Sequence, residues 1–251
     1  MISEARPAAA PAGPSQRAAL AEWPHLRVAT YNIRHGLGMD QRLDIERVAE
    51  TIAATGAEVV ALQEVDQCVA RSGGVDQPRV LERLTGLTVH FFPTLSLQGG
   101  RFGIALAARE RVEIDVALLA SLGKDRPHGR IAGRYLGITF VATHLSRWRS
   151  TRNSELASLA TLLRSCRRPA VLMGDLNARP YRLRRRLQRE GLAFPRTMPP
   201  TYSSVRPRRR VDYIAATDDL LLEKLRSHPS IASDHLPLVA DLTWRAQATR
   251  R

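Results

Sequence analysis

The stretch VLMGDLNARPYRLRRRLQRE, residues 171–190, joins an apolar run to a string of arginines. Its first four residues are apolar or small and indicate a strand that is buried within a sheet. Asp175 and Asn177 follow directly, and six arginines come within the next twelve residues. Side chains two residues apart point to the same face of an extended backbone. The stretch therefore predicts a buried sheet with a carboxylate and an amide at its edge and positive charge beside them.

Other apolar runs predict a layered fold around this strand. The clearest helix is expected over Ile45–Thr55, because Asp44 precedes it as an N-cap residue and Gly56 follows it as a stop signal. Further helices are expected at 153–164 and 181–190. Strands are expected at 27–33 and in the runs that begin at Glu58, Gly103, Ile138, Pro169, Val211 and Leu238. Strands outnumber helices, and the apolar runs are typical of sheets that are covered on both faces. The sequence therefore predicts a fold of the α+β class in which helices and sheets form a sandwich (an α/β sandwich).

The chain ends and the cysteines constrain domain organisation and compartment. Residues 1–25 are rich in Ala and Pro and lack an apolar run of signal-peptide length, so we expect a disordered tail, one domain at 26–245 and a short C-terminal tail at 246–251. No stretch approaches the roughly 18 apolar residues that span a bilayer. Cys68 and Cys166 fit neither a disulfide framework nor a zinc site. We expect a soluble, cytoplasmic monomer.

The net charge of +14 is confined to one part of the chain. Residues 144–210 contain 17 arginines, no lysine and three acidic residues, which accounts for +14, whereas the remaining 21 basic and 21 acidic residues cancel. A general preference for Arg codons is not expected to localise charge in this way. We therefore expect a focused field that attracts an anionic partner.

Polar side chains capable of chemistry stand at the ends of several expected strands, where sites are usually built. They are Asn32, Glu64, His144, Asp175, Asn177 and Asp212. Taken singly, each has an ordinary explanation. Glu64 could be a carboxylate facing water, His144 a histidine near the core, and Asp234 with His235 turn residues before a proline.

Their joint occurrence favours a catalytic metal site. The oxygen donors Asn32, Glu64, Asp175 and Asp234 suit Mg²⁺, Mn²⁺ or Ca²⁺ better than zinc. His235 would titrate near neutral pH, and a carboxylate such as Asp212 could fix its tautomer. This inventory predicts metal-assisted hydrolysis of an anion.

Six motifs are spread from about residue 27 to residue 241: ATYNIRHG, VVALQEVD, VATHLS, VLMGDLNARP, TYSSVRPRRRVDYI and ASDHLP. In order and rough spacing they resemble the endonuclease/exonuclease/phosphatase superfamily, also called deoxyribonuclease-I-like. The resemblance implies a four-layered sandwich, in which two mixed β-sheets pack face to face with helices outside and the site lies at one rim.

The resemblance also implies residue roles. Asn32 and Glu64 resemble ligands of the catalytic Mg²⁺, with Asp234 a further ligand or near neighbour. Asp175 and Asn177 resemble the pair that positions and activates the attacking water and contacts the phosphate.

Two histidines complete the implied site. Asp212 resembles the acid that orients His235, and His235 and His144 resemble the histidines that grip the scissile phosphate. One serves as general base and the other stabilises or protonates the departing oxygen, and the sequence leaves this assignment open.

Some segments depart from the family pattern. Arg34 stands where abasic-site endonucleases have an acid, so the deoxyribonuclease and small-phosphodiesterase branches fit better. Ile104 and Ala108 replace a usual Asn and Ser, and Arg126 takes the place of the Glu in a Glu-Pro-Arg-Gly segment. Substrate contacts around 101–130 therefore do not follow from the resemblance.

Arginines adjoin three of the motifs and are expected to bind substrate phosphates, because guanidinium groups bind phosphate oxygens in pairs. The expected set is Arg147, Arg149, Arg179, Arg182, Arg208 and Arg210. Trp148, between two of them, could stack on a base. The alternative for part of 182–189 is a solvated helix face.

Three functions remain open at this point. The first is a Mg²⁺-dependent nuclease or related phosphodiesterase that binds nucleic acid. The second is a hydrolase of phospholipid, inositol phosphate or another small phosphoester, with an anionic membrane surface as a possible partner. The third is a non-catalytic nucleic-acid-binding module, which the joint presence of Glu64, Asp175 and His235 disfavours.

Overall fold

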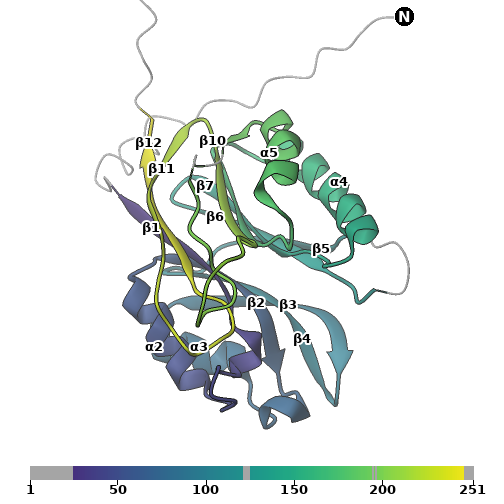
Figure 1. The fold of residues 1–251 in the computed structure, drawn as a ribbon, viewed down its shortest axis with the longest axis vertical. Coiled ribbons are helices and arrows are strands. Elements are labelled where there is room, and N and C mark those ends of the chain that lie inside the picture. Colours follow the sequence, from purple (N-terminus) through teal and green to yellow (C-terminus); the bar gives the residue numbers. More distant parts are fainter. Residues whose placement is uncertain (1–24, 121–124, 194, 196, 246–251) are drawn as a thin grey trace, which may run out of the picture.

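Two six-stranded β-sheets form the frame of the protein (Figure 1). A computed structural model describes residues 25–120, 125–193, 195 and 197–245, so the expected tails, apart from residue 25, lie outside the described residues. In spatial order, the first sheet contains β11 (Leu220–Ser227), β12 (Leu238–Trp244), β1 (Leu26–Asn32), β2 (Val59–Gln67), β4 (Gly100–Ala108) and β3 (Thr88–Leu97). The second contains β5 (Ile114–Leu118), β6 (Gly129–Tyr135), β7 (Ile138–His144), β8 (Ala170–Asp175), β10 (Asp212–Thr217) and β9 (Leu192–Ala193).

Both sheets follow the same pairing scheme. Each has one central parallel pair, β1 with β2 and β7 with β8, and antiparallel pairs on either side. A parallel pair needs a crossover connection, which contains α2 (Ile45–Thr55) in the first sheet and α4 (Arg149–Ser165) in the second. The carboxyl ends of two parallel strands thus meet at one edge of each sheet.

Helices cover the outer face of each sheet. The helices α2 and α3 (Gln77–Thr85) lie on the first sheet, whereas α4 and α5 (Pro180–Arg189) lie on the second (Figure 1). Short 3₁₀ turns, η1 (Arg34–Gly36) and η2 (Ala70–Ser72), follow β1 and β2. The predicted four-layered sandwich of two mixed sheets is therefore confirmed. Among the described helices, none is both long and apolar enough to cross a membrane.

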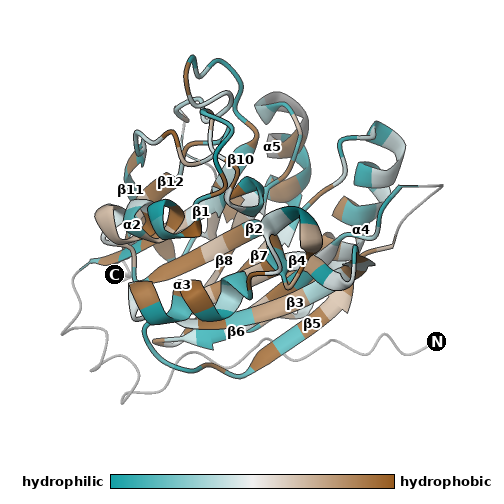
Figure 2. Cartoon of the chain, turned by 90° about the horizontal axis from the view of Figure 1, so that it is seen from below, coloured by the Kyte–Doolittle hydropathy of each residue, from teal (hydrophilic) through white to brown (hydrophobic). Residues whose placement is uncertain are grey.

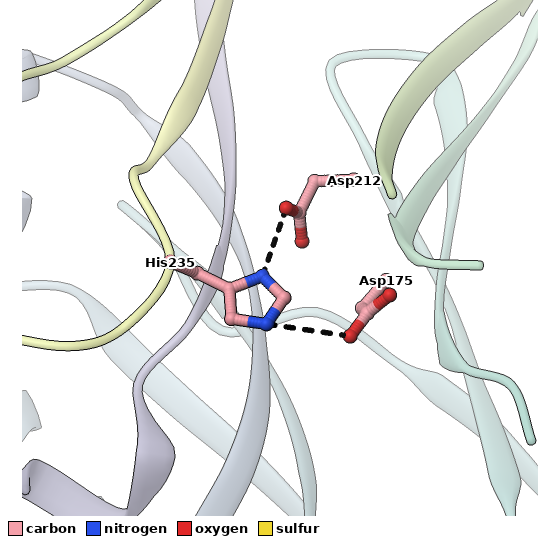
Figure 3. A group of neighbouring side chains, drawn as sticks. All are labelled: Asp175, Asp212 and His235. Atoms are coloured by element: carbon pink, nitrogen blue, oxygen red, sulfur yellow. Dashed lines mark hydrogen bonds and ion pairs between the residues drawn. The ribbon is translucent and has the colours of Figure 1, made fainter. Parts of the chain in front are cut away.

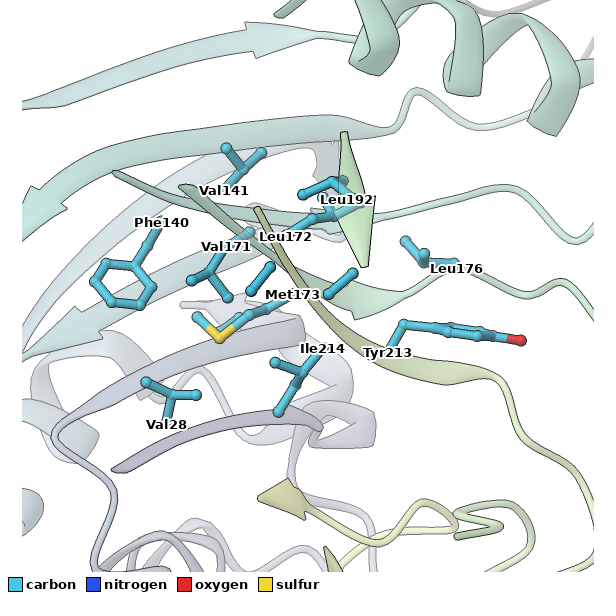
Figure 4. Close-up of a cluster of buried hydrophobic side chains, with 14 of the residues drawn as sticks. Val28, Phe140, Val141, Val171, Leu172, Met173, Leu176, Leu192, Tyr213 and Ile214 are labelled. Atoms are coloured by element: carbon cyan, nitrogen blue, oxygen red, sulfur yellow. The ribbon is translucent and has the colours of Figure 1, made fainter. Parts of the chain in front are cut away.

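The main core lies between the sheets and continues under α4 and α5. Figure 4 shows Met173 of β8 on the side of Val28 from the opposite sheet, while Leu172 faces away from it. All six residues of β8 are buried. Burial on both faces explains why this strand reads as an unbroken apolar run rather than an alternating one.

The outer helices are amphipathic. Figure 2 shows hydrophobic residues along the strands, and α2 and α3 with both hydrophilic and hydrophobic residues. A second apolar cluster joins α2 and α3 to the outer face of the first sheet. The N-cap prediction for α2 is confirmed, because the Asp44 side chain accepts a hydrogen bond from the Arg47 amide and Gly56 adopts a left-handed conformation.

Several elements differ from the sequence-based expectation. The helix expected at 153–164 begins four residues earlier, at Arg149, although Trp148 supplies no side-chain cap. Strands β3, β5, β6, β9 and β11 and helix α3 were not predicted. The edge strand β5 is largely exposed and β6 contains two glycines, so neither shows the apolar pattern on which the prediction depended. Pairing with neighbouring strands determines such segments.

Candidate active site

The eight predicted site residues converge at one rim of the sandwich, where β1, β2, β7 and β8 end and β10 and β12 begin. A pocket of about 280 Å³ opens there. Asn32 and Asp212 lie behind it, in contact with its walls. The six that line it are Glu64, His144, Asp175, Asn177, Asp234 and His235.

His235 connects two buried carboxylates (Figure 3). Its Nδ1 lies 2.9 Å from Asp212 Oδ2, and its Nε2 lies 3.8 Å from Asp175 Oδ2. The Thr201 hydroxyl also donates to Asp212 Oδ2. Burial lowers the pKa of His235, but the adjacent Asp212 carboxylate raises it more, so the pKa rises to about 10. His235 is therefore an imidazolium at neutral pH.

Asp175 is the last residue of β8 and is only 2% exposed. Its Oδ1 accepts the Asn177 backbone amide at 3.0 Å, and its Oδ2 accepts the Asn32 side-chain amide at 3.3 Å. Burial, and then the negative charge of Asp212, raise the pKa of Asp175 well above the usual range for a carboxyl group. Such a carboxylate is a stronger proton acceptor than an exposed one.

The residue before Asp175 is a glycine because the parallel strands approach closely here. A Cβ atom at Gly174 would overlap the carbonyl oxygen of Thr143 on β7. The close approach sets His144 beside Asp175 in the strand register.

His144 and Asn177 form the wall next to Asp175. His144 Nε2 lies 3.5 Å from Asp175 Oδ2 and 3.4 Å from Asn177 Nδ2, and Asn177 also donates to the Leu145 carbonyl at 2.9 Å. Burial, and then the positive charge of Arg126, lower the pKa of His144 well below its usual value. At neutral pH His144 is therefore uncharged, in contrast to His235.

The reason given for pairing Asp175 with Asn177 was wrong. An extended backbone was expected through both residues, but β8 ends at Asp175 and Asn177 has a φ of 49°. The two side chains reach the same pocket because the backbone turns, with Asp175 accepting the amide two residues ahead.

Glu64 reaches the pocket through a β-bulge. The pairing of β2 with β4 shifts between Gln63 and Val65, which leaves Glu64 unpaired with a φ of 57°. Bulges of this kind redirect a side chain and are common beside active sites. Gln63 and Val65 are fully buried, whereas the Glu64 side chain is 23% exposed. Its Oε1 accepts the Asn32 amide at 3.3 Å.

Further pocket residues were absent from the predicted set. Arg126 Nη2 lies 3.6 Å from Glu64 Oε1, and Arg34 Nε lies 3.9 Å from Asp234 Oδ2. The Tyr202 ring lies 5.0 Å from that of His235. Arg34 and Arg126 each stand where some family members have an acidic residue. This replacement of a negative by a positive charge was the sequence signal that could have indicated a role in the pocket.

An arginine-lined groove of about 840 Å³ adjoins the pocket. The two share Arg147, Asn177, Arg209 and Val211. None of its described lining residues is acidic. The basic residues that line it are Arg147, Arg152, Arg179, Arg208, Arg209 and Arg210.

Four of the six arginines expected to bind substrate line this groove, namely Arg147, Arg179, Arg208 and Arg210. Arg149 is exposed at the start of α4 but lines neither the groove nor the pocket. The side chain of Arg182 lies outside the described part of the chain. Arg152 and Arg209 were not in the predicted set, because spacing alone does not give the direction of each side chain.

Two overlapping groups of donor atoms could hold a cation. Asp175, Asp212 and His235 offer atoms within 4.8 Å of one another, and Asp212 Oδ1 is buried with no hydrogen-bond partner among the described residues. However, Asp212 Oδ2 and His235 Nδ1 already bind each other. Glu64 and Asp175 both contact the Asn32 amide and both line the pocket. The carboxylates of Glu64 and Asp175 fit a hard divalent cation, whereas Asn32 directs its amide nitrogen at them and its oxygen accepts the Arg34 backbone amide.

Comparison with known proteins agrees with this geometry. The sequence profile described as the Endonuclease/Exonuclease/phosphatase family matches residues 29–235. No curated protein matches the chain. A solved endonuclease/exonuclease/phosphatase from Beutenbergia cavernae is 27% identical, with 88% of this chain and 72% of that chain covered and a TM-score of 0.76.

Two more distant structures share the fold. The human Nocturnin catalytic domain, solved with a bound sulfate anion, is 22% identical over 88% of this chain and 95% of that chain, with a TM-score of 0.66. A mannosyl-6-phosphatase from Bacteroides thetaiotaomicron is 15% identical over 87% of this chain and all of its own, with a TM-score of 0.67. With a family profile matched over most of its length, the chain belongs to the endonuclease/exonuclease/phosphatase family.

Proposed function

We propose that this phosphoesterase is a Mg²⁺-dependent phosphodiesterase that hydrolyses nucleic acid. The observation that carries the proposal is the continuity between the catalytic pocket and the arginine-lined groove. The pocket combines a buried carboxylate with two histidines of opposite protonation state, and the groove beside it concentrates positive charge. A substrate with one reacting phosphate and further phosphates beside it would occupy both the pocket and the groove.

We propose that Glu64 holds the metal, with Asn32 beside it and Asp234 at the rim of the same pocket. When bound, a divalent cation polarises a phosphoryl oxygen and neutralises charge that develops during hydrolysis. Mn²⁺ or Ca²⁺ would satisfy the same oxygen ligands.

The remaining polar residues supply orientation and proton transfer. Asp175, whose pKa is raised by burial, is placed to accept a proton from the attacking water, and Asn177 is placed to orient that water and the phosphate. His235, protonated because Asp212 lies beside it, would donate to a non-bridging or departing oxygen. His144, which is uncharged, would bind the phosphate without proton transfer. We therefore assign the proton-accepting role to Asp175 rather than to either histidine.

The charge of the groove favours a polymer over a small phosphoester. Arg147, Arg179 and Arg208 form no ion pair with any carboxylate in the described part of the chain, so they are available to phosphates. Trp148, at the N-cap of α4, is 70% exposed, and its carbonyl accepts the amide of the groove residue Arg152. An exposed indole next to Arg147 suits stacking on a nucleic-acid base.

A substrate panel tests the proposal. Purified protein is incubated with single-stranded DNA, duplex DNA, RNA, phosphomonoesters and anionic phospholipid vesicles, with Mg²⁺ or EDTA, beside an Asp175→Ala control. We expect Mg²⁺-dependent cleavage of a nucleic acid, weakened by Arg179→Ala combined with Arg208→Ala. Hydrolysis confined to the phosphomonoester or to the lipid would refute the nuclease assignment while retaining the phosphoesterase chemistry.

A further inference from the structure

Glu155 on α4 is a fully buried carboxylate that does not line the pocket. Its Oε2 accepts the Ser146 backbone amide at 2.8 Å, two residues after His144 in the chain. Its Oε1 lies 2.8 Å from the Nδ1 of His128, a close contact in which neither atom makes a hydrogen bond within the described residues. One carboxylate thus connects α4, the segment after β7 and the residue before β6.

His128 extends this connection to the pocket wall. Its side chain is only 5% exposed, and its ring lies edge-on to the ring of His144, with 5.6 Å between centroids and 70° between planes. The backbone carbonyl of His128 accepts the Leu119 amide at 2.8 Å. The adjacent Gly129 carbonyl accepts the Thr143 hydroxyl at 2.9 Å. His128 is therefore fixed from several directions.

Polar contacts hold the Nε2 atom of His144 only loosely. Asp175 and Asn177 approach its Nε2 at 3.5 and 3.4 Å, both long for hydrogen bonds. We propose that Glu155 and His128 form a buried positioning pair that fixes the ring of His144 against the scissile phosphate. This inference rests on the proposed function, because it concerns the orientation of a residue assigned there to phosphate binding. The pair acts through His144, since neither member lines the pocket.

Stability alone is a weak reason to bury such a pair. Polar groups removed from water lose hydration, and an apolar pair of similar volume is often as stable. A close buried contact does, however, constrain the position of each side chain. Direction matters for His144, because a displacement of about 1 Å of a catalytic group can cost roughly 100-fold in rate.

The experiment compares Glu155→Gln and His128→Phe with the unmodified protein. Gln keeps an acceptor for the Ser146 amide, and Phe keeps a ring edge against His144 but cannot pair with Glu155. Glu190→Gln is the matched control, since it removes a different carboxylate contact of α4, the ion pair between Arg164 and Glu190 at 2.7 Å. Each protein is assayed with bis(p-nitrophenyl) phosphate and Mg²⁺. The imidazole resonances of His144 and His235 are recorded separately by NMR in the metal-free protein, and folding is checked by urea denaturation.

For both test variants we expect kcat to fall by about 10- to 100-fold, with KM changed less than about threefold. The His144 resonance should shift or broaden, whereas the His235 resonance and the Glu190→Gln protein should be unchanged. An unmoved His144 resonance in folded variants would overturn the positioning role, whatever the effect on kcat. The unmodified protein could hydrolyse no phosphoester while the His144 resonance still shifts in Glu155→Gln and His128→Phe. In that case the proposed function fails, and the contact that orients His144 stands.

Discussion

Asp212→Asn is expected to lower the pKa of His235 from about 10 toward its ordinary value of 6.5. Burial lowers the pKa of His235 and is retained in the variant, whereas the Asp212 charge that raises it is lost. Asn keeps an oxygen that can accept the Nδ1–H now directed at Asp212 Oδ2, 2.9 Å away. The geometry is therefore preserved while the largest of the charges that raise the pKa is removed, and the smaller effects of Asp175 and Asp234 remain.

The size of the effect follows from the shift. The difference between about 10 and 6.5 exceeds three pKa units, and one unit corresponds to about 1.4 kcal/mol, so the stabilisation of the imidazolium is on the order of 5 kcal/mol. Because the pKa of folded His235 lies above its unfolded value, this stability is fully present below pH 6.5 and is lost as the pH rises to about 10. In Asp212→Asn this loss should be much smaller over that range, because only the weaker effects of Asp175 and Asp234 remain.

The assay is an NMR titration of the His235 ring from about pH 5 to pH 10.5 in EDTA, with the resonance assigned from His235→Gln. The free energy of unfolding is measured over the same pH range. Asp66→Asn is the control, because Asp66 is equally buried but pairs with Arg71. A titration midpoint in Asp212→Asn equal to that of the unmodified protein would refute the assigned cause.

Three further perturbations test other parts of the site. Asp175→Asn should raise the thermal unfolding midpoint in EDTA at pH 8, because a carboxyl group whose folded pKa is raised costs stability above its unfolded pKa of 3.8; a lower midpoint would contradict this. Glu64→Gln should weaken Mg²⁺ binding at least about tenfold by calorimetry, and unchanged affinity would remove Glu64 from the metal site. For nucleic-acid binding, the logarithm of the binding constant falls linearly with the logarithm of the salt concentration, and Arg179→Ala combined with Arg208→Ala should reduce the steepness of this slope by about 2. Arg185→Ala, on the exposed face of α5, should leave that slope unchanged.

The central strands, and the positions of the predicted site residues at their ends, were accessible from the sequence for a physical reason. Strands buried on both faces, such as β8, read as apolar runs. A polar residue at the end of such a run lies at the edge of its sheet, so Asp175 and His144 could be located without coordinates. The exposed edge strand β5 gives no such signal.

Backbone turns and cross-chain contacts were not accessible. Glu64 and Asn177 reach the pocket through positive-φ conformations, which the alternation of side chains along a strand does not predict. The contact between His128 and Glu155 joins the residue before β6 to α4, and no local pattern connects the two. Likewise, the run of arginines in 179–189 did not indicate that Arg179 lines the groove whereas Arg185 does not.

Hydrolysis of bis(p-nitrophenyl) phosphate tests the central claim most directly. The rate is measured for the unmodified protein with Mg²⁺ and with EDTA, and for Asp175→Asn with Mg²⁺. We expect hydrolysis that requires Mg²⁺ and falls by at least about 1,000-fold in Asp175→Asn, since this variant keeps the shape of the pocket but removes its proton acceptor. Hydrolysis that persists in EDTA, or that Asp175→Asn retains at a comparable rate, would contradict the account.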